Sequence, residues 1–297
     1  MESGQCISLL MPTRGRRPLA ERFLESVAAT AALPDLVEVI FYADEDDLES
    51  HNIEVSGIRV SGIVGPRASM GTYNSQCLAK ARGEIVILVN DDIVVRTQGW
   101  DEKVRAMDAS FPDKIYLAYG NDLFKGARLC TFPILSRRTC DLLGDPFPTA
   151  YAGAFIDYHL LDIFRRLQHA SEDRIRYLPD VVFEHMHYRL GKATKDTTYQ
   201  RRRRFDDDAV FIGLIGKRRR AAYKLMDAMR GANQSVVADQ VTEGESQAQV
   251  EWCWSLRSIA KRFLLDHDLP LKWRIFLWYW YTGRFMAAKG LLWPLIR

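Results

Sequence analysis

Three polar residues, Asn90, Asp91 and Asp92, directly follow Glu84–Val89, the clearest buried strand in the sequence. Carboxylates at the end of an apolar strand are costly to bury unless something stabilises them, and a divalent cation would do so. Their hard oxygen atoms suit Mg²⁺ or Mn²⁺, and such an ion is commonly shared with the phosphates of a substrate. The alternative is a polar strand end at which an Asp caps a turn. The motif alone leaves both interpretations open.

The elements around this motif must bring further polar residues to it. The apolar pattern predicts strands over Cys6–Met11, Leu36–Tyr42, Ile58–Val64 and Glu84–Val89, and helices over Pro18–Thr30 and Met70–Ala81. This alternation predicts a parallel sheet with right-handed crossovers, in which ligands bind beyond the carboxyl ends of the strands. Thr13 and Arg14, then Asp44, then Asn90–Asp92 follow three of these strands. We therefore expect these residues to meet at one edge of the sheet.

The rest of the chain has a mixed pattern. It predicts helices over Trp100–Ala109, Phe155–Leu167 and Val210–Met229, and strands over Lys114–Tyr119, Leu129–Leu135 and Tyr177–Phe183. Residues 231–249 are rich in Gln, Ser, Glu, Asn and Gly, which is typical of a linker. We therefore divide the chain into a domain over 1–208, a helix over 209–230 packed on it, a linker over 231–250 and an amphipathic helical segment over 251–297.

Composition excludes several classes of protein. The net charge of +3 is too small to indicate a nucleic-acid-binding protein as a whole. The five cysteines are scattered and form no Cys-x-x-Cys pair, so we expect neither a disulfide framework nor a cysteine zinc site, and a reducing compartment fits better. The chain starts without a signal-peptide pattern and has no apolar stretch near the ~18–20 residues of a membrane span. These observations favour a cytoplasmic protein.

Four segments of the chain occur in an order and at a spacing known from one group of enzymes. They are Cys6–Arg17 (CISLLMPTRGRR), Val37–Asp47 (VEVIFYADEDD), Gly71–Gly83 (GTYNSQCLAKARG) and Glu84–Asp92 (EIVILVNDD). Together they resemble the GT-A-fold glycosyltransferases, especially the large inverting family 2. The resemblance covers about residues 5–190. It implies an α/β, GT-A (Rossmann-like) fold with a mostly parallel sheet flanked by helices, followed here by a C-terminal helical appendage.

The resemblance also implies a nucleoside-diphosphate sugar as donor and Mn²⁺ or Mg²⁺ as cofactor. The residues that it places around the nucleotide and its diphosphate are Pro12, Thr13, Arg14, Asp44, Arg67, Asn74, Asn90 and Asp91. Asn90 stands at the first position of the family's Asp-x-Asp metal motif. The principal metal ligand is therefore expected to be Asp92, with Asp91 as a second candidate.

A catalytic base is expected further along the chain. In the family, an acidic residue that opens a helix after a glycine-containing loop takes the proton from the acceptor hydroxyl. Gly153–Leu160 matches that context, which makes Asp157 the candidate. A carboxylate near a helix start stays ionised at working pH, as a base must. The alternative is an Asp that only caps the helix. Ile156 stands where the family often has a second acid.

His185 and His187 end the last predicted strand and point to the same face of it, because side chains alternate along a strand. Related enzymes often place a histidine there, near the metal or the diphosphate. A neutral imidazole can complete the coordination of a metal, and a protonated one can offset diphosphate charge. The alternative is a pair of surface histidines, and the sequence does not choose between the two residues.

The polar segment Arg189–Arg204 is predicted to be a loop. Its basic residues are suited to close over a diphosphate, since Arg binds phosphate through a fork of donors and closure excludes water. They are Lys192, Lys195 and Arg201–Arg204. The alternative is a solvated charge run balanced by Asp206–Asp208.

Residues 252–297 hold six of the seven tryptophans, with eight Lys or Arg residues and two acids. Aromatic rings with basic residues suit the headgroup region of an anionic membrane. This predicts peripheral contact with a membrane, which would fit a lipid-linked acceptor and the inner face of the membrane. The alternative is a helical hairpin that packs its tryptophans on the domain or on a second subunit.

The predicted function is thus metal-dependent transfer of a sugar from a nucleotide sugar to a hydroxyl of a glycan or lipid-linked glycan, with inversion. One alternative is a nucleotidyltransferase, although Pro12–Arg17 holds a single glycine where such enzymes carry a glycine-rich loop. Another is a non-catalytic protein that binds sugar nucleotides or a membrane surface. A nucleic-acid acceptor has only the arginine runs in its favour.

Overall fold

The computed structural model describes residues 5–187, 190–192, 205–231 and 255–291. Its centre is an eight-stranded sheet with the order β3-β2-β1-β4-β7-β6-β8-β5. The strands are β1 (Ile7–Thr13), β2 (Val37–Asp44), β3 (Arg59–Gly65), β4 (Ile85–Leu88), β5 (Ile93–Val95), β6 (Leu117–Asn121), β7 (Pro133–Ser136) and β8 (Ile175–His185). The predicted α/β fold class is confirmed.

The directions of the strands decide which residues share an edge. Strands β3, β2, β1 and β4 are mutually parallel, while β7 runs antiparallel to both β4 and β6. Strand β8 is parallel to β6, and β5 pairs antiparallel with its end, with Ile93 opposite His185. The carboxyl ends of β1, β2, β4, β6 and β8 therefore lie at one edge of the sheet, together with the start of β5.

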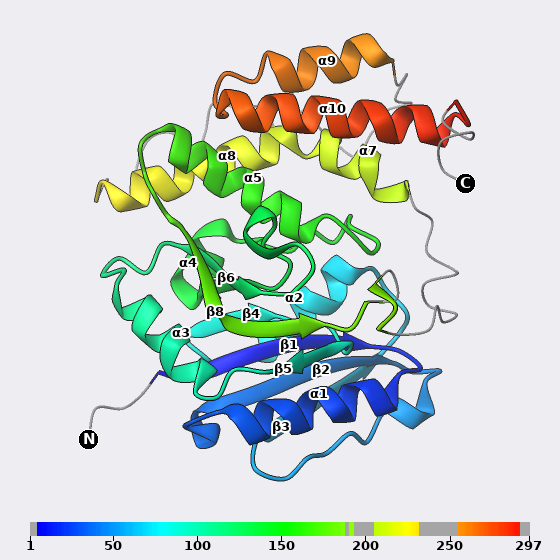
Figure 1. The fold of residues 1–297 in the computed structure, drawn as a ribbon, viewed down its shortest axis with the longest axis vertical. Coiled ribbons are helices and arrows are strands. Elements are labelled where there is room, and N and C mark those ends of the chain that lie inside the picture. The colour runs from blue at the N-terminus through cyan, green and yellow to red at the C-terminus, as the bar shows by residue number, and fades with distance from the viewer. Residues whose placement is uncertain (1–4, 188–189, 193–204, 232–254, 292–297) are drawn as a thin grey trace.

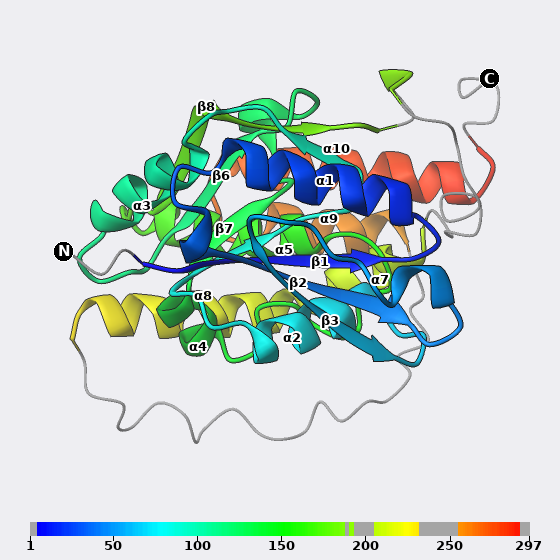
Figure 2. The ribbon, with the colours of Figure 1, turned by 90° about the horizontal axis from the view of Figure 1, so that it is seen from below.

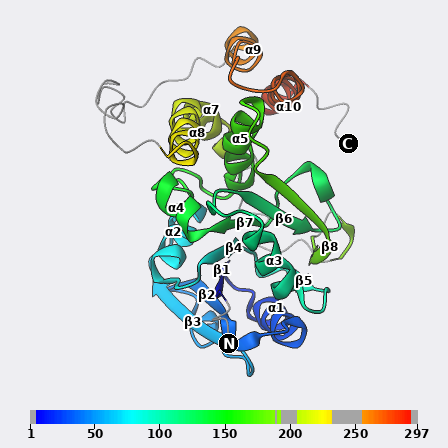
Figure 3. The same cartoon turned by 90° about the vertical axis from the view of Figure 1, so that its left-hand side faces the viewer.

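Helices cover both faces of the sheet (Figures 2 and 3). On one face lie α1 (Arg17–Thr30) and α3 (Trp100–Ala109), and on the other lie α2 (Met70–Lys80), α4 (Arg137–Leu143) and α5 (Ile156–His169). Strand β1 serves both faces, because Leu9 and Met11 join the cluster of α1 while Leu10 joins that of α2. A strand buried on both faces reads as a continuous apolar run.

The C-terminal helices form an outer layer. Helices α7 (Asp206–Gly213) and α8 (Ile215–Met229) lie against α5, and the pair α9 (Leu256–Leu264) and α10 (Leu271–Ala288) lies beyond them (Figure 1). The predicted helical appendage is thus confirmed. Trp273, Leu277 and Tyr281, spaced four apart on α10, are buried in the same apolar cluster as α5. The hairpin therefore packs an aromatic face on the domain. Among the described helices, none is long and apolar enough to cross a bilayer.

Several features differ from the expectations. Strand β5 and helix α4 were not predicted, and Val210–Met229 forms two helices that meet at Leu214. The second half of the sheet contains antiparallel pairs, because an apolar run predicts a strand but not its direction. The proposed division of the chain at residue 208 falls inside α7. That division into segments stays a proposal.

Candidate functional site at the carboxyl edge of the sheet

Asp91 lies in the turn after β4 and is held by the end of β1. Its carboxylate accepts from Thr13 Oγ1 at 2.9 Å and from Arg16 Nη1 at 3.1 Å, one bond to each oxygen. Burial raises the pKa of Asp91 to about 6, with Arg16 opposing that rise and Asp92 adding to it. With both oxygens hydrogen-bonded, Asp91 fastens β4 to the β1 end. Its role as a second metal ligand stays a prediction.

Asp92 is the buried carboxylate that meets the histidines. Its Oδ1 lies 3.4 Å from His185 Nε2, and its Oδ2 lies 3.9 Å from Arg16 Nη1. Strand β8 fixes this meeting, since the backbone of Met186 donates to Asp92 O at 2.8 Å. His187 lies beside His185, with ring centroids 5.0 Å apart, and stacks on Phe124. The structure thus brings Asp92 and His185 together, and the role of either residue as a metal ligand stays a prediction.

The chemistry of this pair fits a divalent metal. His185 is buried, and neither of its ring nitrogens has a hydrogen-bond partner among the described residues. An imidazole in that state is costly unless something binds it, and a cation beside a carboxylate would do so. The described residues contain no group of three or more His, Cys, Asp or Glu side chains arranged to hold a metal. An ion here would thus need further oxygen ligands, as Mg²⁺ commonly takes from substrate phosphates.

A second group of polar side chains surrounds Asp44 at the end of β2. Tyr73 donates its hydroxyl to Asp44 Oδ1 at 2.6 Å, and Arg14 donates to Asp44 Oδ2. Arg14 also binds Asp46 through both terminal nitrogens, at 2.5 and 2.7 Å. The ring of Tyr42 lies against that of Tyr73, with centroids 4.6 Å apart. This group combines two tyrosine rings with a carboxylate, which together suit a flat heterocycle with N–H donors.

The remaining predicted nucleotide residues are spread around these two groups. Pro12 is buried in β1 beyond the residues paired with β4, a place that tolerates its missing N–H. Asn74 is buried in α2 and donates to Met70 O at 3.0 Å, so it braces its own helix. Arg67 is exposed, and its charge lowers the pKa of Asp46 after the larger effect of Arg14. Asn90 is half-buried just before the aspartates.

Asp157 lies in the first turn of α5, as predicted. Its backbone carbonyl accepts from Cys130 Sγ at 3.1 Å. Two residues further along, Phe132 packs its ring 5.3 Å from that of His185. The segment that leads into β7 therefore runs between the start of α5 and the histidines. This arrangement places Asp157 on the same side of the molecule as the carboxyl edge, and its role as a base stays a prediction.

Sequence reasoning missed three residues of the site. Arg16 contacts both aspartates, and Tyr73 contacts Asp44. Asp122, directly after β6, accepts the backbone N–H of His185 through its carbonyl at 3.1 Å. Arg16 stands in the same basic run as Arg14, and that run was the available signal. Tyr73 and Asp122 carry no motif, because their partners are distant in sequence.

Only part of the segment that was predicted to close over a diphosphate belongs to the described residues. Lys192 donates to Glu184 Oε1 at 2.6 Å, beside Arg96, which holds the other oxygen. Lys195 and Arg201–Arg204 lie outside the described residues. Asp207 and Asp208 are buried, so two of the three acids proposed to balance the basic run are bound within the fold.

Comparison with known proteins gives matches among solved structures alone. No family model matches the chain, and no curated protein matches it. A mannosyltransferase from Pyrobaculum calidifontis, solved with GDP-Man and Mn²⁺, is 15% identical with a TM-score of 0.47 over 78% of this chain and 76% of its own. Glucosyl-3-phosphoglycerate synthase from Mycobacterium tuberculosis, solved with Mn²⁺ and UDP-glucose, is 18% identical with a TM-score of 0.47 over 73% and 80%. TarS from S. aureus is 16% identical with a TM-score of 0.43 over 60% and 36%.

Proposed function

We propose that this protein is a GT-A glycosyltransferase that moves a sugar from a nucleoside-diphosphate sugar to an acceptor hydroxyl. The observation that carries the proposal is the meeting, at one edge of the sheet, of two groups with different chemistry. One is the Asp44 group with its aromatic faces, and the other is the buried pair of Asp92 and His185. A nucleoside diphosphate offers a matching heterocycle and a metal-binding diphosphate.

Asp92 and His185 would hold the divalent ion, Mn²⁺ or Mg²⁺. When bound, it would supply positive charge to the departing diphosphate. The Asp44 group orients the base, and Arg16 and Arg14 bring positive charge to the same edge. Asp157 accepts the proton of the acceptor hydroxyl while that oxygen attacks the anomeric carbon. The bond from this carbon to the diphosphate breaks, the electron pair leaves with the diphosphate, and the anomeric configuration inverts.

The first test is binding of UDP, GDP, CDP and dTDP, measured by calorimetry with Mn²⁺ and with EDTA. We expect one nucleotide to bind in Mn²⁺ and to lose at least about 10-fold in affinity in EDTA or in Asp92→Asn. Asp227→Asn is the matched control, since Asp227 is exposed on α8. If no nucleotide binds to the folded wild-type chain, the proposal is wrong, and a non-catalytic surface-binding protein becomes the better interpretation.

The nucleotidyltransferase alternative makes a different prediction for the products. Such an enzyme joins a nucleoside triphosphate to a sugar phosphate and releases diphosphate. Two incubations of the wild-type protein separate the classes, one with the preferred nucleotide as triphosphate together with a sugar 1-phosphate, and one with it as sugar nucleotide. A transferase of sugars releases a nucleoside diphosphate from the sugar nucleotide and leaves the triphosphate intact.

We further propose that the outer face of α10 contacts an anionic membrane, which would bring a lipid-linked acceptor within reach. Leu271, Ile275 and Tyr279 are exposed at a spacing of four residues, so they form one apolar stripe. Exposed basic side chains lie on the same hairpin. They are Arg257, Lys261, Lys272 and Lys289. An apolar stripe together with basic residues is typical of helices that lie in the headgroup region.

A further inference from the structure

Asp207, the second residue of α7, fills a ring of backbone donors just before α5. Its Oδ1 accepts from the N–H of Ala152 at 2.8 Å, and its Oδ2 accepts from Gly153 at 2.9 Å and Ala154 at 2.7 Å. The side chain is buried, with a residue exposure of 6%. Three successive N–H groups that converge on one carboxylate make a strong, charge-assisted clamp. The loop 152–154 is therefore fixed from a distant part of the chain.

The clamp controls the direction in which the chain enters α5. Phe155, the next residue, has a left-handed backbone with φ of 71°, which a non-glycine residue adopts only when its surroundings enforce it. Its ring packs against Phe211 of α7 and against Trp280 and Tyr281 of α10, with centroids 5.5–6.0 Å apart. Asp157 follows two residues later. Its position thus depends on both the clamp and this aromatic packing.

Helix α7 is itself tied to the C-terminal hairpin. Asp208, next to Asp207, accepts from Arg284 of α10 through both carboxylate oxygens, at 2.8 and 2.9 Å from Nε. The Arg284 guanidinium also lies over the Phe155 ring, 5.2 Å from its centroid. The two adjacent acids therefore face opposite ways, one to the loop before α5 and the other to α10.

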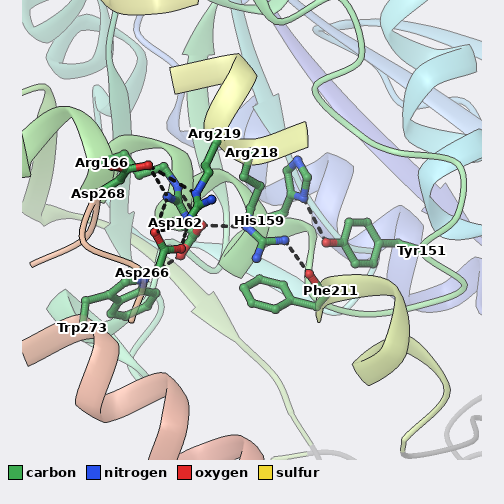
Figure 4. Close-up of polar contacts among 10 residues, drawn as sticks. All are labelled: Tyr151, His159, Asp162, Arg166, Phe211, Arg218, Arg219, Asp266, Asp268 and Trp273. Carbon is green, nitrogen blue, oxygen red and sulfur yellow. Dashed lines mark hydrogen bonds and ion pairs between the residues drawn. The ribbon is translucent and has the colours of Figure 1, made fainter. Parts of the chain in front are cut away.

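The body of α5 is held separately, by a buried network (Figure 4). Asp162 accepts from Arg218 Nε at 2.7 Å, from Arg166 Nη2 at 3.1 Å and from Trp273 Nε1 at 2.9 Å. Arg166 also reaches Asp266, at 2.7 Å. Because this network fixes the middle of α5, a change in the conformation of the loop 152–154 would displace only the first turn of the helix. Local control of Asp157 therefore lies with the loop.

We infer that Asp207 is a positioning residue for Asp157, and that α7 and α10 hold the acceptor side of the active site in place. The inference rests on the proposed function, because it takes Asp157 as the base. Asp207 touches no reacting atom in this scheme. It acts by keeping the carboxylate of Asp157 within reach of the acceptor oxygen, and small misplacements of a catalytic group are costly.

The test compares Asp207→Ala and Asp207→Asn with Asp206→Ala, a matched control because Asp206 is exposed on the same turn. Water serves as acceptor, and the probes are UDP-glucose and GDP-mannose with Mn²⁺, with release of the nucleoside diphosphate measured. We expect Asp207→Ala to lower kcat by about 100-fold with little change in KM or in nucleoside-diphosphate affinity. Asp207→Asn keeps an oxygen that can accept from Gly153 and Ala154, so its kcat should lie between those of Asp207→Ala and Asp206→Ala.

Amide hydrogen exchange over residues 152–158 supplies a second readout that needs no turnover. Protection of this segment should be lost in Asp207→Ala and kept in Asp206→Ala. Unchanged kcat or unchanged protection in Asp207→Ala would overturn the inference, and so would an equal loss of nucleotide binding, which would indicate a general loss of structure. Failure of the proposed function would give a different result, since the wild-type protein itself would then neither bind a nucleoside diphosphate nor hydrolyse either probe.

Discussion

At the scale of single residues, the two carboxylates of the proposed mechanism occupy different surroundings. Asp92 is buried, with its carboxylate near both His185 and Arg16. Asp157 is half-buried at the start of a helix, where the helix dipole favours its ionised form. The difference predicts that one residue governs binding and the other governs turnover.

Replacement of Asp157 by Asn should separate these roles. The amide keeps the shape but accepts no proton, so release of the nucleoside diphosphate from the preferred sugar nucleotide should fall by about 10²–10⁴-fold. The affinity for that nucleoside diphosphate with Mn²⁺ should stay at the wild-type value, as measured by calorimetry. Full turnover in Asp157→Asn would show that Asp157 is a capping residue, the alternative that the sequence left open.

Candidate site residues could be predicted from the sequence where their neighbours in the chain carry a pattern. Asp92 follows an apolar strand, and Asp157 opens an amphipathic helix after a glycine-containing loop, so each had a local signal. Tyr73 and Asp207 had none. Asp207 looked like part of a solvated acidic run, and its burial becomes visible only when α7 is placed against the loop 152–154, which is distant in sequence.

At the scale of elements, α5 carries two charged residues, Asp162 and Arg166, that are buried among further charged residues. Burial by itself pushes the pKa of Asp162 upward, but Arg218 and then Arg166 more than offset it, so that pKa lies below its ordinary value. The pKa of Asp266 is also lowered, because Arg166 and Arg219 outweigh its burial. Ionised Asp162 and Asp266 thus stabilise the contact of α5 with α8 and the hairpin.

Asp162→Asn should lower the free energy of unfolding by about 3–5 kcal/mol near neutral pH, because it leaves two buried guanidinium groups short of negative charge. A carboxyl whose pKa is lowered in the folded state stabilises it above the unfolded pKa of about 3.9. That stabilisation is lost as the pH falls through the lower folded value.

The difference in melting temperature between wild type and Asp162→Asn should therefore be constant between about pH 5 and 7 and shrink below about pH 4. Thermal melts followed by circular dichroism at a series of pH values measure it. Asp227→Asn, on the exposed side of α8, should show no such dependence. A difference that persists unchanged into acid would mean that the Asp162 charge contributes nothing.

The boundaries of the strands and helices show which elements can be predicted from local sequence patterns. Strand β4 and helix α2 were predicted within about two residues, because a buried strand and a helix ended by a glycine segment have strong local signatures. Strand β5 has three residues, too few for any periodicity, and exists because β8 pairs with it. The antiparallel direction of β7 depends on its long-range pairing with β4, which apolar spacing does not encode.

At the scale of the whole molecule, the C-terminal hairpin has an inner face bound to the domain and an outer face open to solvent. The inner face holds Trp273, Leu277 and Tyr281, which agrees with packing on the domain. The outer stripe of Leu271, Ile275 and Tyr279 is what remains for a membrane. Deletion of the hairpin would disturb both faces at once, so substitutions on the outer face are the cleaner test.

Ile275→Gln combined with Tyr279→Ser should weaken binding to vesicles that contain an anionic lipid, because it removes apolar side chains from the stripe while leaving the buried face intact. Co-sedimentation with anionic and with neutral vesicles measures this. Tyr223→Ser is the control, since Tyr223 is an exposed aromatic residue on α8. Equal sedimentation of the double variant and the wild type would exclude this stripe as the membrane contact.

The ion pair between Arg166 and Asp266 has a consequence for the order in which the protein folds during its synthesis on the ribosome. These partners are separated by 100 positions in the chain. Strands β1 to β4 are complete early in synthesis and can pair with one another as they emerge. The helix that carries Asp157 must wait, with Arg166 only partly neutralised, until the segment that contains Asp266 has been made. A chain interrupted before the hairpin would thus have its parallel strands assembled and α5 without its Asp266 partner.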